Sequence, residues 1–182
     1  MHDQMEVTAS QLFEALELTL EDGPKEIQKK VVAFKALWDQ ASMDVRREKN
    51  KLGQNLLHMM DVYGFKQLIE ETLQVMPELA LQHAKLDGDY PIHTAVLNHQ
   101  IEVVQLLLAI PGVARLKNSL HQSALHYAAR FGSQDMMRLC CKFCAGEINA
   151  KDRLGRTPLA LAQAENTPDV ETVLMAHGAD PN

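Results

Sequence analysis

The 182-residue sequence predicts an all-α solenoid, a row of stacked helix pairs with a helical cap at its N-terminal end. A short motif recurs four times, in the segments NLLHMMDVYG, PIHTA, SALHYAARFG and TPLALAQAEN. The copies continue into apolar runs with helical spacing, such as IEVVQLLLAI at Ile101–Ile110. Self-similarity at a period of about 33 residues indicates stacked units that share one continuous core.

The copies begin at Asn50, Lys85, Asn118 and Asp152, so their spacings are 35, 33 and 34 residues. These starts divide the chain into an N-terminal segment, 1–49, and four repeats, 50–84, 85–117, 118–151 and 152–182. Three residues after the start, three copies carry a glycine, which suits a turn with positive φ: Gly53, Gly88 and Gly155. His121 takes this column in the third copy, which predicts a distorted turn there.

The four copies resemble ankyrin repeats, whose signature includes T-P-L-H-x-A. The last copy matches best, with DRLGRTPLALA at its head and VLMAHGADPN at its tail, and the resemblance covers residues 50–182. It implies that each unit is a β-turn finger followed by a short inner helix and a longer outer helix. The first copy departs most, because Leu56 replaces the proline and Met60 and Asp61 replace two small residues.

A histidine recurs in three copies, as His58, His93 and His126. The resemblance implies that each imidazole bonds to the backbone of the next unit, where it satisfies buried polar groups. The fourth copy has Ala160 in this column. We therefore expect the fourth copy to be a C-terminal cap; the alternative is that the chain was cut from a longer array.

Residues 1–49 are predicted to form two helices. Thr8 and Gln11 make a capping box, and the stretch Glu21–Pro24 interrupts the helical pattern. An apolar stripe over nearly six turns follows: Ile27, Val31, Phe34, Trp38, Ala41 and Val45. This stripe favours a helical cap on the first repeat. Pro24–Phe34 also has a faint likeness to the opening of an F-box helix, so an F-box-like ubiquitin-ligase adaptor is the alternative function.

Composition excludes several classes of function. The net charge is −6 with no basic stripe, which argues against a nucleic-acid partner. No apolar run approaches the roughly 18–20 residues of a membrane span. The first residues have neither a basic start nor an apolar segment, so we expect no secretory signal and a cytoplasmic location. The cytoplasm is that of the protein's own cell, or that of a host cell if the protein is a bacterial effector.

The three cysteines lie close together as Cys140, Cys141 and Cys144. A zinc site usually needs a second pair of ligands, and no second cysteine pair exists, so we expect apolar core residues and no metal. The sequence also lacks a nucleophile elbow, a phosphate-binding glycine loop and the H-E-x-x-H motif. We therefore expect neither an enzyme nor a cofactor.

The predicted function is binding of another protein, as a monomeric adaptor. The resemblance places the freely varying positions on the fingers and at the ends of the inner helices. The predicted partner-binding residues are Leu52, Tyr63, Leu86, Asp87, Asp89, Asn98, Leu120, Arg130, Phe131, Arg153, Leu154 and Arg156. Each finger carries a leucine that either folds back on its neighbour or contributes to an apolar ridge. Asp87 and Asp89 predict that the middle of this surface is acidic. Arg130, Arg153 and Arg156 predict that the half formed by the third and fourth repeats is basic.

Overall fold

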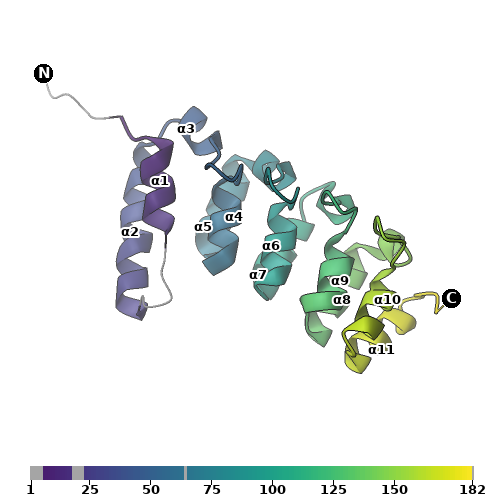
Figure 1. Ribbon diagram of the computed structural model, residues 1–182. Helices are drawn as coiled ribbons and strands as arrows, with labels where there is room; N and C mark the ends of the chain where they lie inside the picture. Colours follow the sequence, from purple (N-terminus) through teal and green to yellow (C-terminus); the bar gives the residue numbers. More distant parts are fainter. Residues whose placement is uncertain (1–5, 18–22, 64, 182) are drawn as a thin grey trace, which may run out of the picture.

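The computed structural model describes residues 6–17, 23–63 and 65–181, and forms an elongated stack of helices (Figure 1). The side chains of Pro24 and of residues 61–63 lie outside this description. The described residues form helices and turns without a strand. The predicted all-α solenoid is therefore confirmed.

The helices form two layers along the stack. The inner helices are α1 (Ala9–Leu16), α4 (Leu56–Tyr63), α6 (Pro91–Leu97), α8 (Ala124–Phe131) and α10 (Pro158–Ala164). The outer helices are α2 (Pro24–Gln40), α5 (Lys66–Val75), α7 (Ile101–Leu108), α9 (Gln134–Phe143) and α11 (Pro168–Ala176). Each inner helix packs on the next inner helix and on the outer helix of its own pair.

Shorter helices connect these pairs. α3 (Met43–Arg47) joins the N-terminal pair to the first repeat. Single 3₁₀ turns follow the outer helices in three repeats: η1 (Pro77–Leu81), η2 (Val113–Arg115) and η3 (Ala145–Glu147). One apolar core runs from the first helix pair to the last, as expected for units that cannot bury their apolar faces alone.

The N-terminal segment forms the two predicted helices, but the second is shorter than its apolar stripe. The capping box is confirmed, since Thr8 N donates to Gln11 Oε1 at 2.8 Å. α2 begins at Pro24 and ends at Gln40, so the expectation of a continuous stripe to Val45 is wrong. Ser42 accepts a hydrogen bond from Val45 N and starts α3 as a separate helix. Glu21 and Asp22 of the predicted interruption lie outside the described ranges.

Each repeat opens with a finger, which we define by the segments 50–54, 84–89, 118–122 and 152–156. The first, third and fourth fingers begin with Asn50, Asn118 and Asp152. In each of these fingers the Oδ1 atom of that residue accepts hydrogen bonds from two backbone N–H groups within the turn. Lys85 cannot do this, and the second finger is one residue longer, closed by a bond from Ala84 N to Asp89 O at 2.7 Å. Asp87 accepts from Asp89 N instead, at 2.9 Å.

The third finger keeps the regular turn although it lacks the glycine. His121 has φ 57°, close to the 76° of Gly155, and its N–H donates to Asn118 O at 2.9 Å. The predicted distortion at His121 is therefore wrong. A left-handed conformation is unfavourable for a side chain with a Cβ, so the surrounding hydrogen bonds hold it there.

Candidate protein-binding surface

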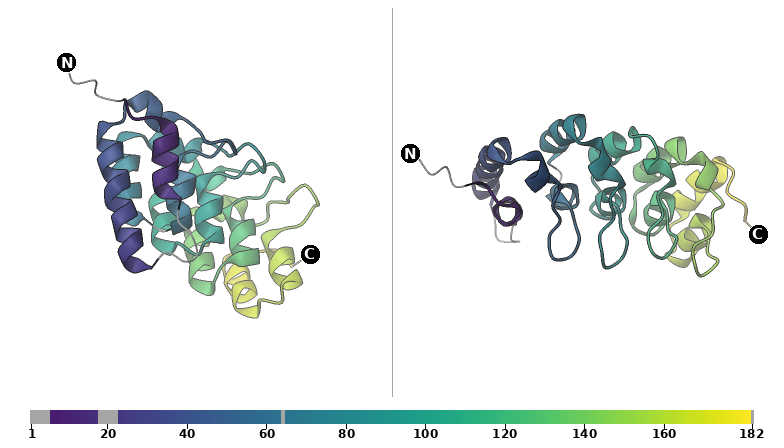
Figure 2. Two further views of the ribbon diagram at one scale, coloured as in Figure 1. Left: turned by 60° about the vertical axis from the view of Figure 1, so that its left-hand side comes forward. Right: turned by 90° about the horizontal axis from the view of Figure 1, so that it is seen from above.

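The fingers project from one side of the stack as a row of loops (Figure 2, right), beside the ends of the inner helices. Each of the last three fingers donates a backbone N–H to a carbonyl of the finger before it. These bonds run from Lys85 to Leu52 at 3.0 Å, from Ser119 to Asp87 at 3.1 Å and from Arg153 to Leu120 at 2.9 Å. The row is therefore one connected surface, because neighbouring fingers are hydrogen-bonded to each other.

The bridging histidines, His58, His93 and His126, hold consecutive repeats together. Their Nε2 atoms lie 3.0, 3.0 and 3.2 Å from the carbonyl oxygens of Asp89, Gln122 and Arg156 in the next finger. Their Nδ1 atoms accept backbone N–H bonds from the residues that precede their own helices, Asn55, Tyr90 and Ser123. In His93 and His126, with Nδ1 as acceptor, the proton lies on Nε2, which donates to the next repeat. His58 Nδ1 also lies 2.8 Å from the Oδ1 of Asn55. The predicted role of the three histidines is confirmed.

Burial keeps these imidazoles neutral. It lowers the pKa of His58 to about 4, against a weaker opposing effect of the Asp89 carbonyl. Burial also lowers the pKa values of His93 and His126 from their ordinary value. Neutral imidazoles are what the geometry of His93 and His126 requires, because Nδ1 can accept a hydrogen bond only when it carries no proton.

Asp89 is a structural residue and not part of the exposed surface. Only 8% of it is accessible, and its carboxylate accepts hydrogen bonds from Tyr127 Oη at 2.7 Å and from Asn118 Nδ2 at 2.7 Å. Burial, and then the bond to Asp89, raises the pKa of Tyr127. The prediction that Asp89 faces a partner is corrected: of the two aspartates expected in the acidic middle, only Asp87 is exposed.

The predicted basic half is largely neutralised within the chain. Arg130 Nε lies 3.1 Å from Glu165 Oε1, and its guanidinium stacks over Phe131, 4.9 Å from the ring centroid. Arg156 Nη2 lies 2.8 Å from Asp152 Oδ2. Arg130 and Arg153 are exposed, and Arg156 is half-buried.

Asp152 is held ionised by its surroundings. Desolvation alone would raise its pKa, but hydrogen bonds from the Arg156 side chain and backbone, from Gln122 and from Leu154 N outweigh this effect and lower it to about 2. The ion pair with Arg156 therefore belongs to the fourth finger's own structure. It leaves less positive charge for a partner than the sequence suggests.

The finger leucines are exposed along the whole row. Leu52 and Leu120 are 49% and 52% accessible, and Leu86 and Leu154 are 76% and 73% accessible. The first two are partly covered, but the last two do not fold back onto a neighbouring finger as one interpretation expected. Exposed apolar side chains on successive connected units are unusual for a surface with no binding role.

A row of aromatic rings runs from His83, just before the second finger, through α6 to Phe131 at the end of α8. Successive ring centroids are 4.9–5.9 Å apart from His83 through Tyr90, His93 and Tyr127 to Phe131. Sequence reasoning identified Phe131 but missed Tyr90 and Tyr127. The signal for Tyr127 was its place next to the histidine column, where the other copies have Met59, Thr94 and Leu161.

Two further predicted residues occupy the ends of inner helices. Asn98 is half-buried, and its Nδ2 donates to Thr94 O at 2.8 Å. Tyr63 ends α4, and its side chain lies outside the described residues. Contact of these positions with a partner stays a prediction.

The cysteines are free and buried in the core, as predicted from their column. Burial raises the pKa of Cys141 to about 11 and, with the neighbouring thiol and Glu147, that of Cys144 to about 12. Within the described ranges, no group of three histidine, cysteine or acidic side chains could hold a metal ion. In the same part of the chain, no helix is long and apolar enough to cross a membrane.

A sequence model of the family described as ankyrin repeats, in three copies, matches residues 92–182, half of the chain. The chain belongs to the ankyrin-repeat family. The match begins within the second repeat, and the first repeat, outside it, has the same finger, helix pair and bridging histidine.

Parts of the chain are similar to curated proteins. The chain is 27% identical over 136 residues to the nuclear factor NF-kappa-B p105 subunit of Gallus gallus, which covers 71% of the chain and 14% of that protein. It is 34% identical over 90 residues to the probable 26S proteasome regulatory subunit p28 of Saccharomyces cerevisiae, covering 49% and 40%. It is 34% identical over 89 residues to regulatory protein NPR5 of Arabidopsis thaliana, covering 48% and 17%. The chain spans less than half of the length of each of these relatives.

Proposed function

We propose that this ankyrin-repeat protein is an adaptor that binds a partner protein through the row of fingers and the adjoining ends of the inner helices. Ankyrin repeats generally mediate protein–protein interaction. The observation that supports the proposal most is the row of exposed finger leucines on fingers joined by backbone hydrogen bonds. A rigid row of apolar side chains loses little entropy on binding.

The expected partner surface is apolar with few charges. Leu86, Leu120 and Leu154 offer apolar contacts, while the Arg130–Phe131 pair offers a flat cationic and aromatic anchor of a type enriched in interfaces. Arg130 pairs with Glu165 and Arg156 pairs with Asp152, which reduces the role of long-range charge attraction to a partner. Association is therefore expected to depend only weakly on salt.

The experiment compares capture of binding proteins by finger variants and by a matched control. Leu86→Asp and Leu120→Asp place charges on two exposed fingers, whereas Val75→Asp places one at the similarly exposed end of α5. We expect each finger variant to capture at least about tenfold less binding protein than the wild-type chain, and the control variant to capture as much as the wild type. Full capture by both finger variants, with folding verified by circular dichroism, would contradict the proposal.

We also propose a reducing cytosolic setting, supported by three buried thiols that form no disulfide. The narrower proposals, an effector acting in a host cell and an F-box-like adaptor, are further predictions. The second rests on Pro24, Glu26, Ile27 and Val31 of α2. It is tested by whether α1 and α2, within the full chain, bind a ubiquitin-ligase core.

A further inference from the structure

The second finger carries two carboxylates that no cation of the chain neutralises. Asp87 is exposed, and its Oδ1 accepts a hydrogen bond from Asp89 N at 2.9 Å. Asp89 is bonded to neutral donors, the hydroxyl of Tyr127 and the amide of Asn118. All lysine and arginine side chains lie within the described ranges, and none of them forms an ion pair with either carboxylate. The second finger is therefore a local site of negative charge.

The fourth finger shows how the chain itself neutralises such a carboxylate. Asp152 Oδ2 accepts hydrogen bonds from Arg156 Nε at 3.0 Å and from Arg156 Nη2 at 2.8 Å. Asp89 takes the place of Arg156 in the second finger, because the carbonyl of each residue closes its finger and lies against a bridging histidine. A carboxylate thus stands where the fourth finger has its neutralising arginine.

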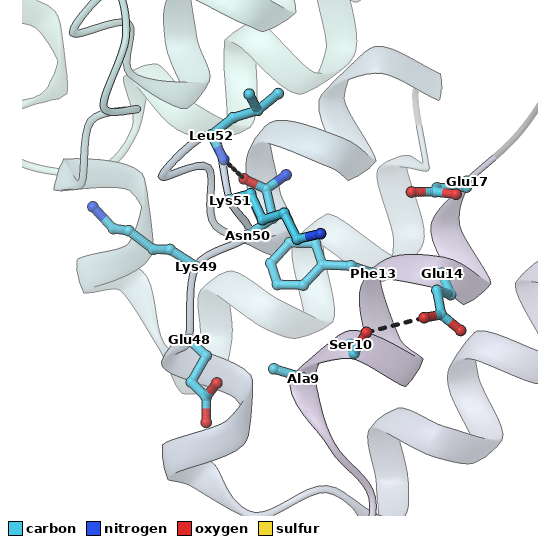
Figure 3. Close-up of a pocket in the computed structure, with 10 residues that line it drawn as sticks. All are labelled: Ala9, Ser10, Phe13, Glu14, Glu17, Glu48, Lys49, Asn50, Lys51 and Leu52. Carbon is cyan, nitrogen blue, oxygen red and sulfur yellow. Dashed lines mark hydrogen bonds between the residues drawn. The ribbon is translucent and has the colours of Figure 1, made fainter.

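Carboxylates near the first finger are accompanied by lysines, unlike those of the second. The groove of about 530 Å³ between α1 and the first finger is lined by side chains of both signs, among them Glu14, Glu17, Glu48, Lys49 and Lys51 (Figure 3). The second finger begins with the exposed Lys85, whose ammonium pairs with neither aspartate among the described contacts. The deficit of positive charge thus distinguishes the second finger from the first and the fourth.

Asp87 lies near a half-buried aromatic ring of the next repeat. Its carbonyl accepts a hydrogen bond from Ser119 N at 3.1 Å, which fixes the second finger against the third. Burial and the bond to Asp89 raise the pKa of Tyr127, and the charge of Asp87 adds to this effect, so Asp87 is within electrostatic reach of the half-buried ring. Leu86, beside Asp87, is 76% accessible. Negative charge, an aromatic ring and an apolar side chain therefore occur together where the second and third fingers meet.

We propose that this junction receives an arginine side chain of the partner protein, whose guanidinium pairs with the Asp87 carboxylate and lies against the Tyr127 ring. A guanidinium suits both contacts, because it is flat, always charged and able to stack on an aromatic face. Arg130, stacked over Phe131 at 4.9 Å from the ring centroid, is an example within this chain. An apolar residue next to the partner's arginine contacts Leu86.

This inference rests on the proposed function and names one chemical feature of the partner. The surface proposed above is mainly apolar, and an apolar row accepts many apolar segments. A segment without a cation would cover the carboxylates of the second finger and leave them unpaired, which is unfavourable. Asp87 therefore selects among apolar segments, and a single arginine adds only one charge to the partner.

A divalent cation is a poorer occupant than a guanidinium. Calcium takes roughly six to eight oxygen ligands. Both carboxylate oxygens of Asp89 already accept hydrogen bonds from Tyr127 and Asn118, which leaves Asp87 as the available carboxylate. In the part of the chain that the structure describes, no group of three acidic, histidine or cysteine side chains could hold a metal ion.

The test uses a blocked tripeptide, acetyl-Leu-Arg-Leu-amide, and the full 182-residue chain. In the matched peptide citrulline replaces arginine, which keeps the shape and removes the charge. Asp87→Asn removes the charge of the finger and keeps an oxygen that can accept from Asp89 N. Asp135→Asn is the control variant, because Asp135 is exposed in the first turn of α9. We expect the arginine peptide to bind wild type and Asp135→Asn alike, and Asp87→Asn roughly 3–10-fold more weakly.

Backbone amide chemical shifts measure these affinities and locate the site. Shifts at the second and third fingers, with the citrulline peptide bound at least about threefold more weakly, support the proposal. Equal binding of the two peptides, equal affinities of Asp87→Asn and wild type, or no saturable binding at millimolar concentration would overturn it. A lysine peptide that binds as tightly as the arginine peptide would overturn the assignment to a guanidinium. Millimolar calcium that shifts the same amides would assign the site to a metal ion and overturn the proposal as well.

Failure of this inference is distinguishable from failure of the proposed function. Leu120→Asp tests the surface through the binding proteins that it captures, whereas Asp87→Asn tests the arginine contact. If Leu120→Asp loses captured proteins that Asp87→Asn keeps in full, the arginine contact is ruled out and the surface stands. Full capture by both Leu86→Asp and Leu120→Asp would instead contradict the surface itself.

Discussion

The junctions between repeats and the junction between the N-terminal helices and the first repeat are built differently. Each repeat junction has a buried imidazole bonded to the next finger and a backbone bond between fingers. Across the N-terminal junction, α1 packs on α4 through buried apolar side chains such as Leu12 and Leu16. Its polar contacts among the described residues are exposed: ion pairs from Lys35 to Glu71 and from Arg47 to Glu78, and a hydrogen bond from Lys49 Nζ to His83 O at 2.9 Å.

The position of a junction along the stack therefore determines how strictly its geometry is fixed. Apolar burial is non-directional and tolerates small shifts, whereas a buried hydrogen bond demands one geometry. The repeats are thus fixed in register, which keeps the finger row continuous. The N-terminal pair covers the end of the core through the contact of α1 with α4.

Acidification should weaken the repeat junctions most. In the unfolded chain a histidine has a pKa near 6.5, whereas burial lowers it in the folded protein, to about 4 for His58. The unfolded state therefore takes up protons first as the pH falls. Stability present above pH 6.5 is lost progressively as the pH falls toward the folded pKa.

Between pH 7.5 and 5.5 the loss is about 1.4 kcal/mol for His58, and the lowered pKa values of His93 and His126 add to this loss in the same direction. Urea denaturation at several pH values measures it. The stabilisation from Asp152, whose pKa is lowered to about 2, is retained in this window and lost only below about pH 4. A stability that is unchanged from pH 7.5 to 5.5 would contradict the buried neutral histidines.

Removing the central imidazole should cost about 3 kcal/mol of unfolding free energy. His93→Ala leaves Tyr90 N and Gln122 O without their partners at 3.0 Å in a fully buried site. Urea denaturation at pH 7.5 gives the value. His177→Ala is the control, because His177 is exposed and bonds within its own helix end. Equal losses of unfolding free energy in His93→Ala and His177→Ala would contradict a special role of the imidazole between repeats.

Tyr127→Phe should cost about 2 kcal/mol, because the buried Asp89 carboxylate loses one donor and keeps Asn118. Thermal or urea unfolding measures the loss. Tyr90→Phe is the matched control, since its ring packs on His83 but its hydroxyl takes no part in the Asp89 network. A neutral effect of Tyr127→Phe would show that the second and third repeats gain nothing from this network.

Glu78→Gln should have the smallest effect, about 0.5 kcal/mol or less. Both side chains of the Arg47–Glu78 pair are nearly half exposed, at 45% and 44%, so water and salt screen the attraction. Comparing the unfolding midpoints at 0.05 M and 0.5 M salt checks this, with about the same value expected for wild type and variant at high salt. A loss above 2 kcal/mol would show that the N-terminal junction depends on charge after all.

The sequence predicted the features that repeat and missed those that depend on single residues. The histidine bonds were implied by the resemblance to ankyrin repeats, which the histidine column shares in three copies, and stacking places these equivalent atoms in equivalent positions. Burial of Asp89 did not follow, since its partner Tyr127 lies 38 residues away and interrupts the pattern. The break after Gln40 escaped detection because Ala41 continues the apolar spacing although Ser42 caps a new helix.

Charge on the candidate surface was the hardest feature to predict. Arg130 and Glu165 belong to different repeats and meet only in the folded stack. Arg156 and Asp152 are close in sequence, but their pairing depends on the turn between them. The exposed leucines were predicted from their positions, and whether they fold back or stand free required the structure.

Native-state hydrogen exchange in low urea tests the contrast between the two regions most directly. It measures the opening free energy of individual backbone amides along the intact chain. We predict that amides around Phe34 in α2 open at a free energy several kcal/mol below those around Leu125 in α8, and in a separate cooperative unit. Equal opening free energies in α2 and α8, with one common urea dependence, would contradict the account.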